Sequence, residues 1–294
     1  AADNVAPGII MYSEGMAVPR DMQGIVAGRV HNALYYPPLL NLNKFIKPEF
    51  AIFRVAELYK EPILREYNLS FFNGYGTELN IFAPGKPAWA EEQYRYLGRT
   101  SRILRENTPH FTSRDFRPLI PTRRDSIWVN AWPLPEEKPG KTAEKTLFTI
   151  YSILPEGSTA PLFEVMPDPA CHFADLWNHE ELLPVRADGK WWIAPVLEGF
   201  SARWLGTNNE GAVGCVARLP RLIEVSLYGD ELSISRVKEN AMNFAPEEGD
   251  SLLLWAGNPE YGKEALCLPA SDISLFLSDH FGWYEGKFVI QLMR

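Results

Sequence analysis

Short apolar runs, each followed by glycine or polar residues, mark the first third of the chain. They cover residues 9–12, 50–55 and 69–72. Continuous apolar runs of this length are typical of strands in a parallel sheet that is covered on both faces. Because helical segments separate strands of that kind, the sequence predicts a parallel α/β unit here.

One long amphipathic helix is predicted after the third run. Glu91 and Glu92 fall in its first turn, and Arg102 and Arg105 in its last, which suits the helix dipole. Its expected buried face consists of residues at helical spacing: Ala90, Tyr94, Leu97, Ser101 and Leu104. The segment 107–109, Asn-Thr-Pro, ends the helix.

From about residue 113 the pattern changes to strand-like runs without long helices between them. The runs are 127–132, 146–154, 162–166, 191–197, 213–219, 222–228, 232–236, 251–255, 273–277 and 287–292. Asp-Gly and Gly-Asp pairs mark hairpin turns at 187–190 and 228–231. We therefore expect a β-sandwich over residues 113–220 and a smaller, immunoglobulin-like β-sandwich over 221–294.

Composition narrows the class of protein. The chain has 294 residues, of which 46% are hydrophobic, and 37 acidic against 29 basic residues give a net charge of −8. Such an acidic chain is a poor candidate for binding nucleic acid or an anionic membrane, and no apolar run is long enough to span a membrane. Three cysteines are too few for a disulfide framework. Aromatic residues make up 13%, which suits either the stacking of sugar rings or an ordinary β core.

The α/β unit predicted over residues 1–112 is too small to stand as a barrel. Three strands cannot close an eight-stranded barrel, and an open three-stranded parallel sheet would leave its faces and edges poorly covered. We therefore expect this unit to be the back part of a larger α/β domain, whose front part lies on another chain or outside this sequence. The alternative is a complete small α/β domain.

Several motifs in this part resemble those of glycoside hydrolases. They are Ser13-Glu14-Gly15, Arg65-Glu66-Tyr67, the segment 70–76 and the arginine-spaced helix that precedes a β-sandwich. The resemblance is to the last βα units of a (β/α)8 barrel, here residues 1–112, followed by C-terminal β-sandwich domains. It implies an enzyme that hydrolyses glycosidic bonds of an oligosaccharide or polysaccharide at the C-terminal ends of the strands, without a cofactor. It also implies a bacterial protein that is secreted or periplasmic, with the cytoplasm as the other possibility.

Glu14 is the first candidate for catalysis, because it lies where an apolar run ends. Glycoside hydrolysis needs two carboxyl groups, one protonated and one ionised. Glu78 follows the turn at 73–76 and could reach the same end of the sheet; otherwise the partner carboxylate lies on the absent front part of the domain. For Glu66, which follows Arg65, we expect a structural ion pair.

Arg29, Arg54, Asn73 and Tyr75 are candidates for binding the substrate on the same face. Asn and Tyr can hydrogen-bond sugar hydroxyls, Tyr can stack on a sugar ring, and Arg can bind a carboxylate. A competing hypothesis is a carbohydrate-binding protein without catalytic activity. In that case four tryptophans of the sandwich would bind the ligand: Trp128, Trp132, Trp191 and Trp192.

Two other clusters have simpler interpretations. Eight arginines between residues 95 and 124 favour an outer helix face and an inter-domain seam of salt bridges over a site for acidic glycans. His172, Asp175 and His179 match no strong zinc pattern, so we expect a loop between strands and no metal.

Overall fold

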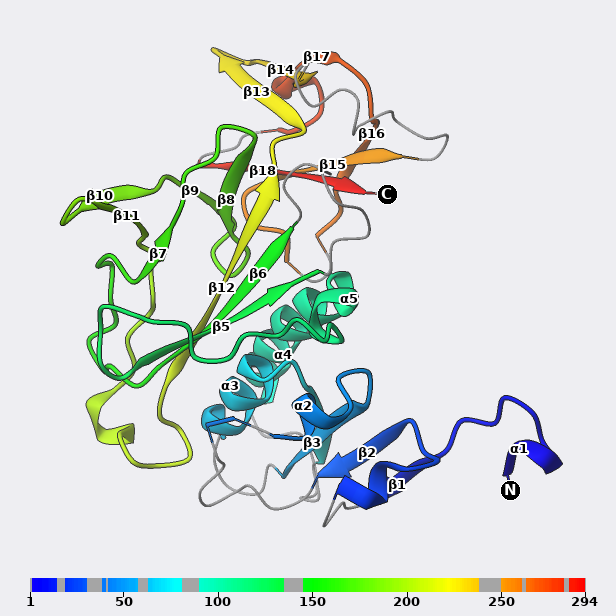
Figure 1. Ribbon diagram of the computed structural model, residues 1–294. Helices are drawn as coiled ribbons and strands as arrows, with labels where there is room; N and C mark the ends of the chain where they lie inside the picture. Colours follow the sequence, from blue (N-terminus) through cyan, green and yellow to red (C-terminus); the bar gives the residue numbers. More distant parts are fainter. Residues whose placement is uncertain are drawn as a thin grey trace.

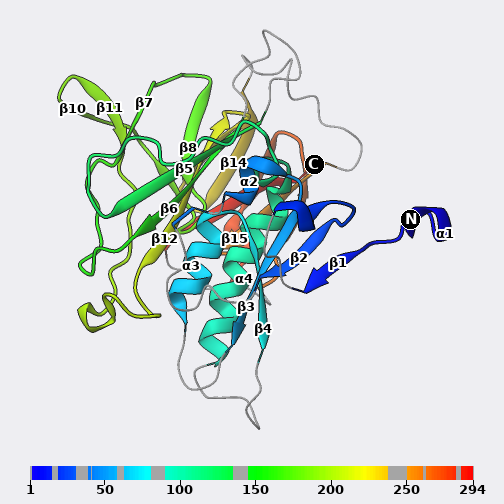
Figure 2. The ribbon, with the colours of Figure 1, turned by 60° about the horizontal axis from the view of Figure 1, so that its bottom comes forward.

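Two helices lie between two sheets in the computed structural model of the protein (Figures 1 and 2). Helices α3 (Leu64–Phe72) and α4 (Ala90–Glu106) contact a parallel sheet on one side, and α3 also contacts an antiparallel sheet on the other. The structure describes residues 2–14, 19–30, 39–40, 42–57, 63–80, 90–134, 145–237, 250–260, 263–282 and 286–293.

The parallel sheet has four strands in the order in which they occur along the chain. They are β1 (Tyr12–Glu14), β2 (Ala27–Val30), β3 (Ala51–Glu57) and β4 (Gly76–Asn80). Every neighbouring pair is parallel, and Glu14 lies opposite Arg29, which lies opposite Phe53. The short helices η1 (Pro19–Met22) and α2 (Asn43–Ile46) occur between these strands, and α1 (Ala2–Val5) lies apart from the sheet, before β1 (Figure 1).

The sequence correctly predicted a parallel sheet with helices in this part of the chain, but it misplaced two of the three expected strands. The run 50–55 lies almost wholly in β3, as expected, and the run 9–12 largely precedes β1. The run 69–72 is not a strand but the end of helix α3. Residues 66–72 of this helix are all buried, because it is covered by a sheet on each side. Strands β2 and β4 were not predicted.

Side chains of the antiparallel sheet hold the end of α3. The last backbone carbonyls of a helix have no partner within it. The carbonyl of Phe72 accepts hydrogen bonds from the side chains of Asn130 (3.0 Å) and Thr149 (2.9 Å), both of which are completely buried. The helix end is therefore capped by the sheet on which it packs.

Helix α4 is confirmed, but its buried face is rotated from the expected one. The buried residues are Ala90, Gln93, Leu97, Thr100 and Ile103, whereas Tyr94 and Ser101 are exposed. A short helix, α5 (Thr108–Phe111), follows directly. Arg102 connects α4 to the C-terminal part of the chain, because its guanidinium donates to the side chain of Gln291 (2.8 Å) and lies over the ring of Trp255.

Two antiparallel sheets form the middle of the chain. The larger contains, in spatial order, β5 (Ile127–Pro133), β6 (Thr146–Ser152), β12 (Ala212–Pro220), β8 (Cys171–Asp175) and β9 (Glu180–Leu182). The smaller contains β10 (Val185–Ala187), β11 (Lys190–Ile193) and β7 (Phe163–Val165), and η2 (Ala202–Trp204) lies before β12. One apolar cluster packs between these sheets, and another packs the larger sheet against α3, α4 and α5.

The C-terminal part is a pair of three-stranded antiparallel sheets around a separate core. One contains β13 (Ile223–Tyr228), β14 (Glu231–Arg236) and β17 (Ile273–Phe276). The other contains β16 (Leu266–Pro269), β15 (Ser251–Ala256) and β18 (Phe288–Met293), and η4 (Leu277–Asp279) follows β17. Each strand-like run expected after residue 113 overlaps a strand, and this half of the chain is antiparallel β structure as predicted. The strands β8, β9, β10 and β16 were not predicted.

In the described part of the chain, no helix combines the length and the apolar character needed to cross a membrane.

Candidate functional site

Three charged side chains meet on one face of the parallel sheet. Arg29, on β2, places Nη2 2.6 Å from the Glu78 carboxylate on β4 and Nη1 3.4 Å from the Glu14 carboxylate at the end of β1. The side chain of Arg29 is 17% exposed, whereas those of Glu14 and Glu78 are 66% and 34% exposed. The two carboxyl groups thus remain open to solvent, while the cation between them is mostly covered.

The same face carries aromatic side chains. Because side chains alternate along a strand, Tyr12 shares this face with Glu14, and Phe53 lies on it opposite Arg29. The rings of Tyr12 and Phe53 are 6.3 Å apart. Two carboxylates, a guanidinium and an aromatic surface are the groups that proteins use to bind and hydrolyse sugars.

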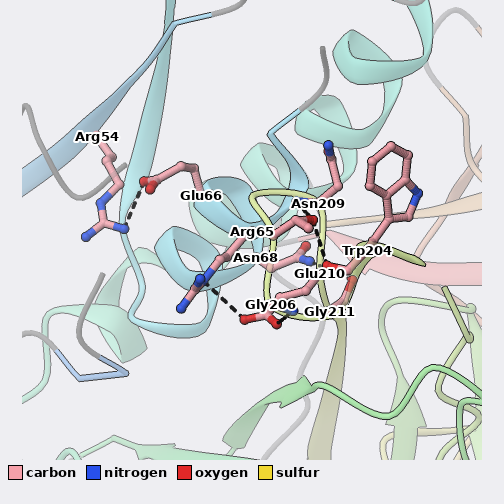
Figure 3. A network of polar contacts seen from close by, with 10 residues as sticks. Arg54, Arg65, Glu66, Asn68, Trp204, Gly206, Asn209, Glu210 and Gly211 are labelled. Atoms are coloured by element: carbon pink, nitrogen blue, oxygen red, sulfur yellow. Dashed lines mark hydrogen bonds and ion pairs between the residues drawn. The ribbon is translucent and has the colours of Figure 1, made fainter. Parts of the chain in front are cut away.

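Arg54 does not lie on this face, although it was expected to line the same surface as Glu14. It points to the helix side of the sheet, where Nη1 is 3.0 Å from the carboxylate of Glu66 on α3 (Figure 3). The two side chains are 7% and 2% exposed. The structural ion pair expected for Glu66 is therefore present, with Arg54 and not the adjacent Arg65 as its partner.

Arg65 instead connects α3 to the loop before β12 (Figure 3). Its Nε lies 3.3 Å from the Glu210 carboxylate, which also accepts a hydrogen bond from the backbone of Gly206 (2.6 Å). One turn later, the amide of Asn68 donates to the carbonyl of Gly211 (2.9 Å). These contacts attach the helix that supports the parallel sheet to the β-sandwich.

Asn73 and Tyr75 are also buried away from the Glu14 face. The amide of Asn73, just after α3, donates to the carbonyls of Leu69 (2.8 Å) and Leu39 (3.0 Å). Tyr75 packs in an apolar cluster that includes Phe50, and burial raises the pKa of its hydroxyl. Of the residues expected to bind substrate, Arg29 is the one that the structure brings next to Glu14.

The segment with His172, Asp175 and His179 was expected to be a loop, but His172 and Asp175 lie on strand β8. The Nδ1 atom of His172 is 3.5 Å from Glu181, and the Asp175 carboxylate accepts hydrogen bonds from the backbone of Trp177 and Asn178. Among the described residues, no group of three or more His, Cys, Asp or Glu side chains is arranged to hold a metal ion.

The four tryptophans of the sandwich do not form one surface. Trp132 is completely buried, with Phe116 stacked on it at 4.0 Å, and Trp128 is half-buried against Tyr151. Trp191 and Trp192 are neighbours on β11, so their side chains point to opposite faces of its sheet. An aromatic platform on a single sandwich face, which a sugar-binding protein of the expected type would use, is not formed by these residues.

Comparison with known proteins finds limited similarity. No family model matches the chain, and no curated protein matches it. Among solved structures, an α-fucosidase of Thermotoga maritima aligns over 66% of this chain and 42% of its own, at 12% identity and a TM-score of 0.30. Another α-L-fucosidase aligns over 74% of this chain and 46% of its own, at 13% identity and a TM-score of 0.33. The chain spans less than half the length of these two enzymes, and at such scores its function has to be argued from its own residues.

Proposed function

We propose that the chain is part of a carbohydrate-active hydrolase that cleaves glycosidic bonds with two carboxyl groups, Glu14 and Glu78. The observation that supports the proposal is the bridge by Arg29, which brings both carboxylates to one open face of the parallel sheet. Glu14 is the last residue of β1, and parallel α/β enzymes carry their catalytic groups at the C-terminal ends of the strands.

The chemistry requires one carboxyl group to protonate the leaving oxygen and the other to attack the sugar or activate water. Catalytic pairs are separated by roughly 5–10 Å, and carboxyl groups that contact the two ends of one guanidinium can lie in that range. Glu14 serves as acid/base or nucleophile, and Glu78 as its partner. Tyr12 and Phe53 offer a surface on which a sugar ring can stack.

The remaining strands of a (β/α)8 barrel would come from an N-terminal part of the same enzyme or from a second chain. The proposal is supported by the four parallel strands in consecutive order with helices on one face, which is the strand order of a (β/α)8 barrel. Parallel sheets are normally covered on both faces. Here the strand β1 is at the edge of the sheet, and apolar residues just before it are exposed, among them Ile9 (50%) and Ile10 (79%). Further strands would cover them.

The test is the activity of the natural assembly, whose composition native mass spectrometry of the protein from its source would show. Glu14→Gln and Glu78→Gln should each lower the hydrolysis of a panel of aryl glycosides by about 10²- to 10⁴-fold, without changing the melting temperature. Glu164→Gln is the matched control, because Glu164 also pairs with a cation on a sheet surface, Lys190 (2.6 Å).

Hydrolysis that survives both substitutions would overturn the assignment. Loss of activity in Glu14→Gln but not in Glu78→Gln would move the partner carboxylate to the second part of the barrel. The competing hypothesis of a sugar-binding protein is less well supported, because the structure buries Trp132 and separates Trp191 from Trp192.

A further inference from the structure

An open cavity of about 300 Å³ lies beside the short helix α2. It is lined by Lys44, Phe45, Ile46, Pro48, Arg114 and Phe116. Two of these six side chains are cationic, the other four are apolar, and none of the described lining residues is acidic. The cavity shares no residue with the Glu14, Arg29 and Glu78 cluster.

Lys44 is an unusual buried cation. The residue is 5% exposed, and its ammonium donates to the backbone carbonyls of Phe111 (2.9 Å) and, more weakly, Pro48 (3.4 Å). It also lies over the ring of Tyr75, at 5.4 Å from the centroid. No ion pair of Lys44 with a carboxylate is found among the described residues, and burial lowers the pKa of Lys44 to about 8. Carbonyl dipoles compensate a buried charge only in part, so a counter-ion would be stabilised here.

The other walls suit the apolar part of a ligand. The ring of Phe45 lies 5.4 Å from that of Phe116, which is itself stacked on the buried Trp132. Phe45 and Ile46 are 49% and 56% exposed, so apolar surface is available without any rearrangement of the core. Arg114 is exposed on the same cavity and can bind a carboxylate with two parallel hydrogen bonds.

We propose that this cavity is a binding site for a small organic carboxylate. The carboxylate would lie between Lys44 and Arg114, and the apolar body of the ligand would lie on Phe45, Ile46 and Phe116. The volume is at the lower end of the range for ligand sites, which favours a molecule of about the size of benzoate. The apolar walls disfavour strongly hydrated inorganic anions, which would have to give up water without a replacement.

Calorimetric titration of the full chain with benzoate tests the proposal, with benzyl alcohol and sulfate as the neutral and the inorganic comparison. Benzoate should bind, and Arg114→Gln should weaken its affinity by about tenfold, which corresponds to about 1.4 kcal/mol. Arg114 is exposed, so this variant should fold normally. Lys44→Met should abolish binding, and in the wild type benzoate should raise the pKa of Lys44, measured by NMR.

Lys47→Met is the matched control. The Lys47 ammonium also donates to backbone carbonyls, those of Ile25 (2.9 Å) and Met22 (3.3 Å), and also lies over an aromatic ring, but it lines a different hollow. Its replacement should leave benzoate binding unchanged. The proposal is overturned if benzoate does not bind, if Lys47→Met weakens binding as much as Arg114→Gln, or if sulfate or benzyl alcohol binds as well as benzoate.

Discussion

Arg54 on β3 and Glu66 on α3 form an ion pair of 3.0 Å in which both side chains are almost completely buried. The pair joins the parallel sheet to the helix behind it, and Arg65, the neighbour of Glu66, joins the same helix to the sandwich through Glu210. A buried pair of this kind is costly to break from one side, because the charge that remains has no partner. Because the pair lies between the parallel sheet and α3, substitutions in it measure how strongly these two layers are held together.

We predict that Arg54→Met lowers the free energy of unfolding by about 3–5 kcal/mol, measured by urea denaturation. The double variant Arg54→Met with Glu66→Met should recover most of the loss, because two apolar side chains of similar length fill the space without a buried charge. Losses that simply add in the double variant would contradict this account.

A second prediction concerns the close approach of two glycines. A Cβ atom on Gly157, whose φ is +70°, would lie 2.4 Å from the carbonyl oxygen of Leu197 and 2.8 Å from the backbone nitrogen of Gly199. Gly189, in the β10–β11 turn, has a similar φ of +76° but nothing within 4 Å. Gly189→Ala should therefore cost about 1–2 kcal/mol from the backbone conformation alone, and Gly157→Ala about 1–3 kcal/mol more. Equal melting temperatures for the two variants would show that the loop at Gly157 relaxes freely.

Helix α3 shows where sequence patterns stop being informative. A helix on the surface has a polar face, and its apolar residues recur with the helical period. Because α3 lies between two sheets, residues 66–72 are buried on every side and the run 69–72 shows no such period. A short continuous apolar run is then equally compatible with a strand. Most of the antiparallel strands were predictable, in contrast, because turn signals such as Gly229-Asp230 separate them, whereas β8, β9, β10 and β16 were not predicted.

The cluster of Glu14, Arg29 and Glu78 was expected from the sequence only in part, because Arg54, Asn73 and Tyr75 were expected on the same face and lie elsewhere. Glu14 stood out because a run of apolar residues ends there. Strands β2 and β4, with the sequences Ala-Gly-Arg-Val and Gly-Thr-Glu-Leu-Asn, carry Arg29 and Glu78 on an open face. The same polar residues that form the site remove the apolar signature of a strand. Which side chains meet depends on the register between the strands, and the pattern of residues along the chain does not predict that register.

A third prediction concerns the contact between α3 and the loop before β12. Asn68 is completely buried, its amide donates to the carbonyl of Gly211 (2.9 Å), and its side-chain oxygen accepts a hydrogen bond from the hydroxyl of Tyr96. Asn68→Ala leaves both groups without this partner and should cost about 2–4 kcal/mol in unfolding free energy. Tyr96→Phe removes one donor and should cost less. The two losses should not add in the double variant, and strict additivity would contradict the proposed network.

The last prediction is a loss of stability in mild acid that depends on His110. This side chain is 3% exposed, and its Nδ1 is 2.8 Å from the carbonyl oxygen of Trp132, so the neutral ring carries its proton on Nδ1 and donates it. Burial lowers the pKa of His110 to about 4, whereas an unfolded chain has a histidine pKa of about 6.5. Between these two values the unfolded state binds a proton that the folded state does not. The contribution of His110 to the free energy of unfolding should therefore be fully present above pH 6.5. It should fall as the pH is lowered to 4, by up to about 1.4 kcal/mol per pH unit. His179, whose pKa burial also lowers to about 4, adds to the same dependence of stability on pH.

The variant His110→Asn keeps a donor for the carbonyl without a titrating ring. Urea denaturation at pH 7, 6 and 5 should therefore show a shallower slope of unfolding free energy against pH than in the wild type. A slope in His110→Asn equal to that of the wild type would remove His110 as the cause.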